Sequence, residues 1–372
     1  MGASLATDQR SLLKQARVAE DDGRYLDAID LLRAALAVDR SSRLDRRLLH
    51  VRNKAFGELE RSIRQTDDRS SETSVSTRSS ASAWPPALPD PFPARPKVGM
   101  PAQIPEVQVG GSGGGADFDS TTVGGGVVHH GAVILRGLLT ANQAQRLRDG
   151  ADEAIEARDR AVAAGNFELG RPHYDRLVPL GGRTEVSRAW VAEVGGILTA
   201  DAPLLFHDLI DAFTDAGLIE IIAGYLGERP TLTFNKSVVR RLVGSAPTWH
   251  QDGRFIGSEV RSLNVWLSLS DCGGDTSTAG LDVVPKRFHD LLDTEGHGST
   301  FLHSIGDALI DREAAEVGVA TPRFHPGDAL VFDERFVHRT SVRPGLTGVR
   351  HAIESWFFAP SHFPSQYVPL VV

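Results

Sequence analysis

Cysteine is almost absent from this chain of 372 residues, in which Cys272 is the only one. No intrachain disulfide can form, and a zinc site built from several cysteine thiolates is excluded. Long apolar runs are missing too, since no uncharged stretch approaches the roughly 20 residues that span a bilayer. The first residues, MGASLATDQR, also lack the apolar core of a signal peptide. We therefore expect a cytoplasmic protein with no membrane partner.

Blocks of positive charge are the next absence. The net charge is −8, and acidic and basic residues are mixed along the chain. Because no basic stripe is present, we do not expect nucleic acid to be a partner. An anionic substrate held by a few local arginines remains compatible with this balance. Arg240 and Arg241 are candidates for that role, although neighbours on a strand cannot both face one pocket.

Three regions differ in composition. Residues 8–66 carry Leu, Ala, Arg and Asp at helical spacing. Within them, Gly23 is expected to end one helix, and an apolar stripe marks the next, at Ala28, Leu31, Leu32, Ala35 and Leu36. This segment resembles the middle of a single tetratricopeptide repeat, and an ordinary pair of amphipathic helices is the alternative. Either form could recruit a protein partner.

Residues 67–120 are rich in serine, then proline, then glycine, ending near GGSGGG. We expect a flexible linker without a single structure, because this composition cannot build a core. Residues 121–372 are globular. A strand is expected at 131–136, then a helix capped by Thr140, then helix at about 201–225, and finally short β-branched runs between Gly, Pro and Asp. Many short strands without long helices between them predict a sandwich or barrel.

The segment TWHQDGRF, at Thr248–Phe255, holds the first chemical signal. In an extended chain His250 and Asp252 would point to the same side. Two histidines and one carboxylate occupy one face of an octahedral Fe(II) site and leave other positions open. The best candidate for the third ligand is His338, in HPGDALVFDERFVHRT. The sequence therefore predicts a metal site at His250, Asp252 and His338.

An arginine follows this triad at a useful distance. Arg350 begins the predicted strand RHAIESWFF, after a turn that contains Pro344 and Gly345. Its planar guanidinium can bind a carboxylate through two parallel hydrogen bonds, as the distal end of 2-oxoglutarate requires.

These segments together resemble the phytanoyl-CoA dioxygenase (PhyH) family of Fe(II)- and 2-oxoglutarate-dependent oxygenases. The likeness covers roughly residues 125–360 and is carried by WHQDG, LNVWLSLSDCG, GLDVVPKRFH and PGDALVFDERFVHRT. It implies a double-stranded β-helix (jelly-roll, cupin-like) core, mainly β with flanking helices. It also implies an oxygenase that uses O₂ and 2-oxoglutarate, releases succinate and CO₂, and is supported by ascorbate in vitro.

The resemblance also implies roles for particular residues. His250, Asp252 and His338 would bind iron, while Arg350 and Thr340 would hold 2-oxoglutarate. Trp266 and Asn264 would line the cosubstrate pocket, and Asn235 would face the substrate. Iron halogenases of this fold replace the carboxylate ligand with a small residue. Because Asp252 is present, hydroxylation of a small-molecule or thioester-linked substrate is the favoured activity.

Other assignments of these residues remain open. The pair His173 and Asp175 repeats the His-x-Asp pattern and could line a substrate entrance or lie in a solvated loop. Arg350 could pair with Glu354, and Arg343 is a rival anchor. At the level of the whole protein, the alternatives are a non-catalytic jelly-roll binding protein and a zinc or manganese enzyme that needs no 2-oxoglutarate.

Overall fold

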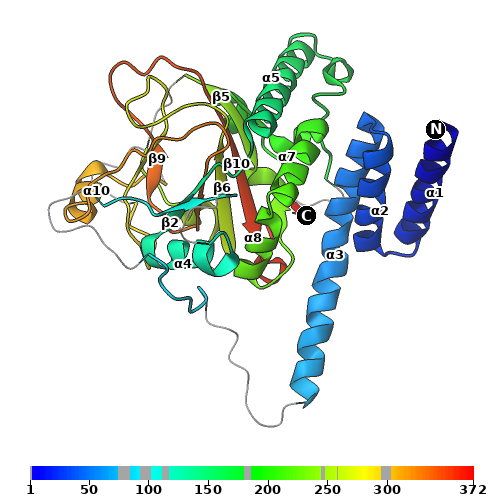
Figure 1. Ribbon diagram of the computed structural model, residues 1–372, viewed down its shortest axis with the longest axis horizontal. Helices are drawn as coiled ribbons and strands as arrows, with labels where there is room; N and C mark the ends of the chain where they lie inside the picture. Colours follow the sequence, from blue (N-terminus) through cyan, green and yellow to red (C-terminus); the bar gives the residue numbers. More distant parts are fainter. Residues whose placement is uncertain are drawn as a thin grey trace.

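The computed structural model describes residues 2–73, 84–92, 102–110, 117–179, 186–243, 248–257, 259–294 and 303–372. Figure 1 shows three N-terminal helices standing beside a larger part in which helices cover a sheet. Among the described residues, no helix combines the length and the apolar character needed to cross a bilayer.

The N-terminal helices are α1 (Gly2–Asp21), α2 (Tyr25–Val38) and α3 (Ser42–Thr73). Gly23 adopts a φ of 76°, which an L side chain rarely adopts, and the chain turns there as expected. The buried residues of α2 are Ala28, Ile29, Leu32 and Ala35, so Leu31 and Leu36 lie at the margin of the predicted stripe. A third helix, α3, completes the bundle.

The helix α3 packs directly against the larger part, beside α7 (Pro203–Asp215) and the last strand, β11 (Pro369–Val371). Arg52 donates to the carbonyl of Val371 at 2.6 Å, and Asn53 donates to that of Pro369 at 2.9 Å. Val371 belongs to the same apolar cluster as α1–α3. The N-terminal helices therefore share a core with the C-terminal end of the chain.

The expectation of one unstructured linker over residues 67–120 is wrong for the parts that the structure describes. The helix α3 continues to Thr73, and Trp84 packs edge-on against Tyr225 with ring centroids 5.1 Å apart. Farther along, β1 (Glu106–Gln108) pairs in parallel with β2 (Ala132–Arg136) and buries Val107. Single apolar residues, such as Trp84 and Val107, pack these stretches against the rest of the protein. The average composition of residues 67–120 does not reveal so few apolar residues. Residues 74–83, 93–101 and 111–116 lie outside the described residues.

In the chain, α4 (Ser120–His130) lies between β1 and β2, and α5 (Ala141–Ala163) follows β2. Thr140 caps α5 as predicted: its hydroxyl accepts from the Gln143 N–H, and the Gln143 side chain accepts from the Thr140 N–H. The helices α7 and α8 (Leu218–Leu226) occupy the region predicted to be helical.

A nine-stranded mixed sheet forms the main wall of the larger part. Its order is β1-β2-β8-β6-β10-β4-β11, with β5 also pairing β10 and β3 pairing β5. Every pairing except β1–β2 is antiparallel. The strands not yet located are β3 (Gly196–Leu198), β4 (Thr231–Thr233), β5 (Val238–Leu242), β6 (Ser262–Ser268), β8 (Ala329–Phe332) and β10 (Arg350–Phe358).

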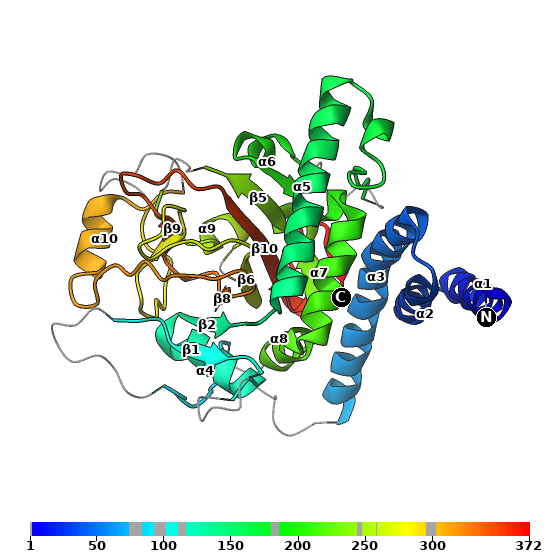
Figure 2. The ribbon, with the colours of Figure 1, turned by 45° about the horizontal axis from the view of Figure 1, so that its top comes forward.

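A smaller sheet lies opposite. It is formed by β7 (Leu281–Val283) and β9 (His338–Thr340), and single antiparallel bridges extend it at Trp249–Ile305, His250–His338 and Val283–Ala320. The short helices α6 (Ala189–Glu193), α9 (Gly253–Ile256) and α10 (Asp307–Glu313) lie in the connections. Figure 2 shows α5, α7 and α8 together on the side of the main sheet away from β9.

The main sheet has two different faces because side chains alternate along each strand. On β6, Leu263, Val265 and Leu267 pack against the helices. The intervening Asn264 and Trp266 face a cavity that β7 and β9 also line. Two facing sheets around a cavity, with helices outside, confirm the predicted jelly-roll core with flanking helices.

Candidate metal centre

The two histidines are placed opposite each other by a backbone bridge. The N–H of His250 donates to the carbonyl of His338 at 3.1 Å, and that of His338 donates back at 3.2 Å. After Gln251 the chain does not stay extended, since Asp252 has helical φ and ψ and precedes α9. The geometric reason given for His250 and Asp252 sharing a side is therefore wrong, yet the turn into α9 brings the carboxylate to the same point.

Gln251 holds this turn in place. It is fully buried, and its Nε2 donates to the carbonyl of Arg335 at 2.6 Å. Its Oε1 accepts from the N–H of Leu292 at 2.7 Å. Gln251, between the two ligands, thus binds the loop at Arg335 and the loop at Leu292. Sequence reasoning missed this role, because an amide side chain between two ligands has no distinctive pattern.

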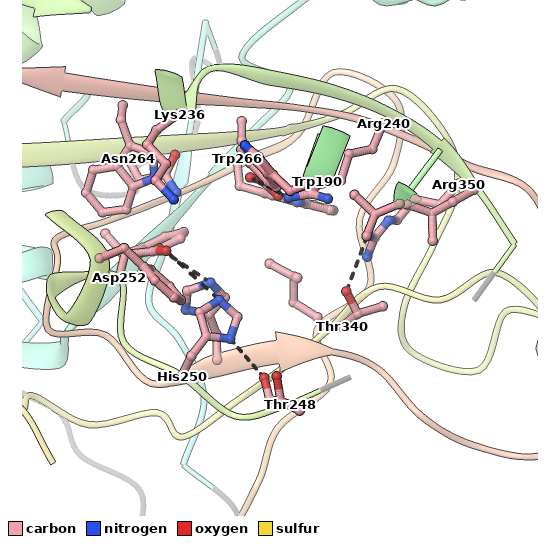
Figure 3. Close-up of a pocket in the computed structure, with 18 residues that line it drawn as sticks. Trp190, Lys236, Arg240, Thr248, His250, Asp252, Asn264, Trp266, Thr340 and Arg350 are labelled. Atoms are coloured by element: carbon pink, nitrogen blue, oxygen red, sulfur yellow. Dashed lines mark hydrogen bonds and ion pairs between the residues drawn. The ribbon is translucent and has the colours of Figure 1, made fainter. Parts of the chain in front are cut away.

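The three side chains meet at one point. The ligand atoms of His250, Asp252 and His338 all lie within 4.8 Å of one another. The Asp252 carboxylate is 4.0 Å from His250 Nε2 and 3.7 Å from His338 Nε2. Figure 3 shows Asp252 directed toward the imidazoles. These separations leave room for one ion between them, and within the described residues no other group of this kind is present.

The tautomers of both histidines suit metal binding. His250 Nδ1 lies 2.8 Å from the carbonyl of Thr248, and His338 Nδ1 lies 3.2 Å from that of Phe336. A carbonyl can only accept, so each Nδ1 carries a hydrogen, and the neutral form of each ring has its lone pair at Nε2. Desolvation, together with neighbouring His250, lowers the pKa of His338 to about 4. His338 is therefore neutral and able to bind a metal at physiological pH.

Arg350 and Thr340 form a second polar group in the same cavity. Arg350 is 2% exposed. Its Nη1 donates to the carbonyl of Gly280 at 3.0 Å and its Nη2 to Thr340 Oγ1 at 3.3 Å, while Nε has no partner. Burial lowers the pKa of Arg350 to about 10, which leaves it protonated near neutrality. Because Thr340 Oγ1 accepts from the arginine, its own hydrogen is available to an anion.

The alternatives for Arg350 are resolved by the geometry. Glu354 is bound by Arg240, with Nε 2.8 Å from the carboxylate, and the structure shows no ion pair from it to Arg350. Although burial opposes ionisation, Arg240 holds the pKa of Glu354 below its ordinary value. The rival anchor Arg343 lies on the surface and donates to the carbonyls of Gly274 and Thr276.

The cavity between the sheets has a volume of about 330 Å³. It joins the triad to Arg350 and Thr340, and Trp266 and Asn264 also line it. Their contact with a cosubstrate stays a prediction. Trp266 Nε1 and Asn264 Oδ1 are buried and have no hydrogen-bond partner among the described residues. Buried polar atoms without partners are costly, so these two atoms are positioned to receive a polar ligand.

The remaining predicted residues lie elsewhere. Asn235 does not line the cavity; its Oδ1 accepts from the N–H of Val368 at 2.8 Å, so its expected contact with substrate is wrong. The second His-x-Asp pair is also outside the site, because His173 contacts Glu153 at 3.0 Å and Asp175 contacts Arg46 at 2.9 Å. Asp175 joins the larger part to α3, whereas His173 contacts α5, and neither residue lines the cavity.

Sequence reasoning also missed cavity residues. Trp190, on α6, and Lys236, in the 3₁₀ turn Phe234–Lys236, both face the cavity. Of the two adjacent arginines, Arg240 lines the cavity and Arg241 turns away to Asp152 at 2.9 Å. Side-chain alternation along β5 predicts that one of the two arginines faces inward. The position of Lys236, in contrast, depends on the 3₁₀ turn, which the sequence did not predict.

Comparisons with known proteins give distant likenesses. No family model matches the chain, and no curated protein matches it. Similar solved structures include apo EctD from S. alaskensis, with a TM-score of 0.42 and 18% identity over 63% of this chain and 74% of that one. AviO1 from Streptomyces viridochromogenes Tue57 gives a TM-score of 0.40 and 18% identity, covering 64% and 94% of the two chains.

A further structure is SnoK, titled a non-heme alpha ketoglutarate dependent carbocyclase from nogalamycin biosynthesis. Its TM-score is 0.40 with 17% identity, over 62% of this chain and 80% of that one. At such values the chemistry of the pocket has to be inferred from its own side chains.

Proposed function

We propose that this protein is an Fe(II)- and 2-oxoglutarate-dependent oxygenase that hydroxylates a C–H bond of a small-molecule or thioester-linked substrate. One observation carries the proposal: a two-histidine, one-carboxylate triad and a buried arginine with a threonine line the same cavity. The donor set suits Fe(II), and it leaves positions for further ligands.

The residues present fit both groups. His250, Asp252 and His338 would hold the iron through Nε2, a carboxylate oxygen and Nε2. The free N–H groups of Arg350 and the hydroxyl of Thr340 would bind the distal carboxylate of 2-oxoglutarate. When bound, iron and 2-oxoglutarate would supply, with O₂ as the oxidant, decarboxylation to succinate and CO₂; one oxygen atom would enter succinate and the other the hydroxylated substrate. The chain's own contribution is to orient both groups and to exclude water from the cavity.

Retention of Asp252 favours hydroxylation over halogenation, because the carboxylate fills the position that a halide would need. The arginine also bears on the two alternatives. A passive binding protein or a zinc enzyme independent of 2-oxoglutarate has no need for a buried guanidinium with unused donors opposite the metal site. The sequence motifs resemble those of the PhyH family, and membership of that family is part of this proposal.

Turnover of 2-oxoglutarate tests the proposal. Purified protein with Fe(II) and ascorbate should release succinate, most strongly with an accepted substrate. Asp252→Ala and His250→Ala should abolish the release, whereas His173→Ala, in the second His-x-Asp pair, should keep it. Succinate formation that is absent across a broad substrate screen, or equal in the Asp252→Ala variant, would refute the proposal.

A further inference from the structure

The cavity contains a cationic side chain that the proposed reaction does not use. Lys236 lines the cavity together with the triad. Its Nζ lies 5.0 Å from the centroid of the Trp190 ring and 4.7 Å from that of Phe255. Within the described chain, the structure gives its ammonium no hydrogen bond and no ion pair, so its three donors face only aromatic rings and the cavity.

The other charges of the cavity are already balanced. Arg240 is bound by Glu354 through contacts of 2.8 and 3.2 Å. Arg350 is directed to the carboxylate of 2-oxoglutarate under the proposed function. Asp252 influences Lys236 through space, but its charge would be shared with the metal. Lys236 therefore retains a positive charge for which the chain supplies no dedicated counter-ion.

A half-buried ammonium without a counter-ion is unfavourable. Burial lowers the pKa of Lys236, as expected for a cation removed from water. The two aromatic faces stabilise it only in part. An anion placed in the cavity would restore the balance and accept hydrogen bonds from the ammonium.

We propose that Lys236 binds an anionic group, a carboxylate or a phosphate, of the substrate, with Trp190 and Phe255 packing against the apolar part next to it. This inference rests on the proposed function, because it assigns Arg350 to 2-oxoglutarate and leaves Lys236 for the substrate. It defines the substrate class as organic anions with an apolar body. Lys236 acts in it as a substrate-binding residue.

Matched pairs of anionic and neutral probes test this assignment. The full chain is loaded with Zn(II) and saturating 2-oxoglutarate, which permits binding without turnover. Saturation-transfer NMR then measures dissociation constants for hexanoate and hexanamide, for 3-phenylpropionate and 3-phenylpropanamide, and for phenyl phosphate and phenol. We expect at least one anion to bind about tenfold more tightly than its neutral partner. The pair that shows the preference distinguishes carboxylate from phosphate.

Variants locate that preference. Lys236→Met should abolish it without weakening the neutral probe, and Lys236→Arg should keep it. Lys54→Met serves as the matched control, since Lys54 also lies over an aromatic ring, that of Tyr25, but far from the cavity in the N-terminal helices. Equal binding of all anions and neutral partners, or a preference that survives Lys236→Met, overturns the proposal.

The same samples separate this proposal from the proposed function. The affinity for 2-oxoglutarate is measured first and should be unchanged in Lys236→Met. If wild-type protein fails to bind 2-oxoglutarate, the oxygenase proposal fails, and the probe pairs, repeated with Arg350→Met, still decide whether Lys236 selects anions.

Discussion

At the scale of single residues, the candidate site depends on which atoms remain unused. The backbone carbonyls of Thr248 and Phe336 occupy the Nδ1 atoms of the two histidines and so leave the Nε2 atoms for a metal. Likewise, the carbonyl of Gly280 and the hydroxyl of Thr340 take two donors of Arg350 and leave its other N–H groups available. The imidazole nitrogens and the guanidinium are therefore oriented for their ligands before any ligand binds.

Arg350→Met should weaken 2-oxoglutarate binding by about 100-fold, because a charge-assisted hydrogen bond to a carboxylate contributes about 1.5–3 kcal/mol. Metal affinity should be unchanged, since Arg350 is not a ligand of the triad. Isothermal titration with Zn(II) and then with 2-oxoglutarate measures both. An Arg350→Met variant that binds 2-oxoglutarate like wild type would remove the arginine from the site.

Thr340→Val should have a smaller effect, about fivefold, because it removes one neutral hydroxyl of roughly 1 kcal/mol. Thr340→Ser keeps the hydroxyl and should bind 2-oxoglutarate like wild type. The same titration checks both variants. A loss in Thr340→Ser as large as in Thr340→Val would show that the methyl group, not the hydroxyl, matters.

Residue-level prediction succeeded where spacing carries chemistry. The order of His250, Asp252, His338 and Arg350 was sufficient to predict one cluster, since each residue type has few other reasons to occur at that spacing. It failed at Asn235, where the 3₁₀ turn Phe234–Lys236 directs the next residue into the cavity. A shift of one position in a short turn cannot be read from composition.

At the scale of elements, the loop before β9 supports the metal site through Glu334, whose backbone reaches the turn after Asp252 and whose buried carboxyl group reaches β6. The backbone carbonyl of Glu334 accepts from the N–H of Gly253, next to Asp252, at 2.8 Å. Its side chain is fully buried and accepts from Ser262 Oγ at 2.7 Å. Desolvation and the adjacent Asp333 raise the pKa of Glu334 to about 8.

This raised pKa predicts a stability that falls with rising pH. The folded protein favours the neutral form of Glu334. The stabilisation that this neutral form gives the fold is therefore complete below the pKa of Glu334 in the unfolded chain. It is lost as pH rises from about 4.5 through about 8. Wild type should therefore lose on the order of 3 kcal/mol relative to Glu334→Gln between pH 5 and pH 8.

Guanidinium unfolding at several pH values measures this difference. Exposed Glu316 provides the control, because Glu316→Gln should run parallel to wild type. Parallel curves for wild type and Glu334→Gln would show that the carboxyl is not held neutral.

Strands and caps were predictable from local patterns, as the Thr140 capping box illustrates, because they depend on neighbours in sequence. The ordered pieces within residues 67–120 were not. Their apolar residues are few and far apart, and they are buried by surfaces from distant parts of the chain, among them the sheet at Val107 and α8 at Trp84.

At the scale of the whole molecule, the N-terminal helices are joined to the larger part by a shared core. Phe56 on α3 packs against Phe363 with ring centroids 5.0 Å apart, and Arg52 binds the carbonyl of Val371. Sequence patterns predicted N-terminal helices but not where they pack on the larger part. The apolar face of a helix does not show which other element will cover it. Whether another face also recruits a protein partner remains a prediction.

Phe56→Ala should destabilise the protein by about 3 kcal/mol and reduce hydrogen-exchange protection in both α1–α3 and β11, because the two share one cluster. Combined with Phe363→Ala, the loss should fall short of the sum by about 1 kcal/mol. Strict additivity, with protection lost in the N-terminal helices alone, would contradict a shared core.

The central claim is that one cavity binds Fe(II) and 2-oxoglutarate together. Its most direct test is the weak visible absorption that develops when both are added without oxygen. Wild type and His173→Ala should develop the band, Arg350→Met should need far more 2-oxoglutarate, and Asp252→Ala should show none. A wild-type protein without the band at saturating concentrations, or an undiminished band in Asp252→Ala, would contradict the account.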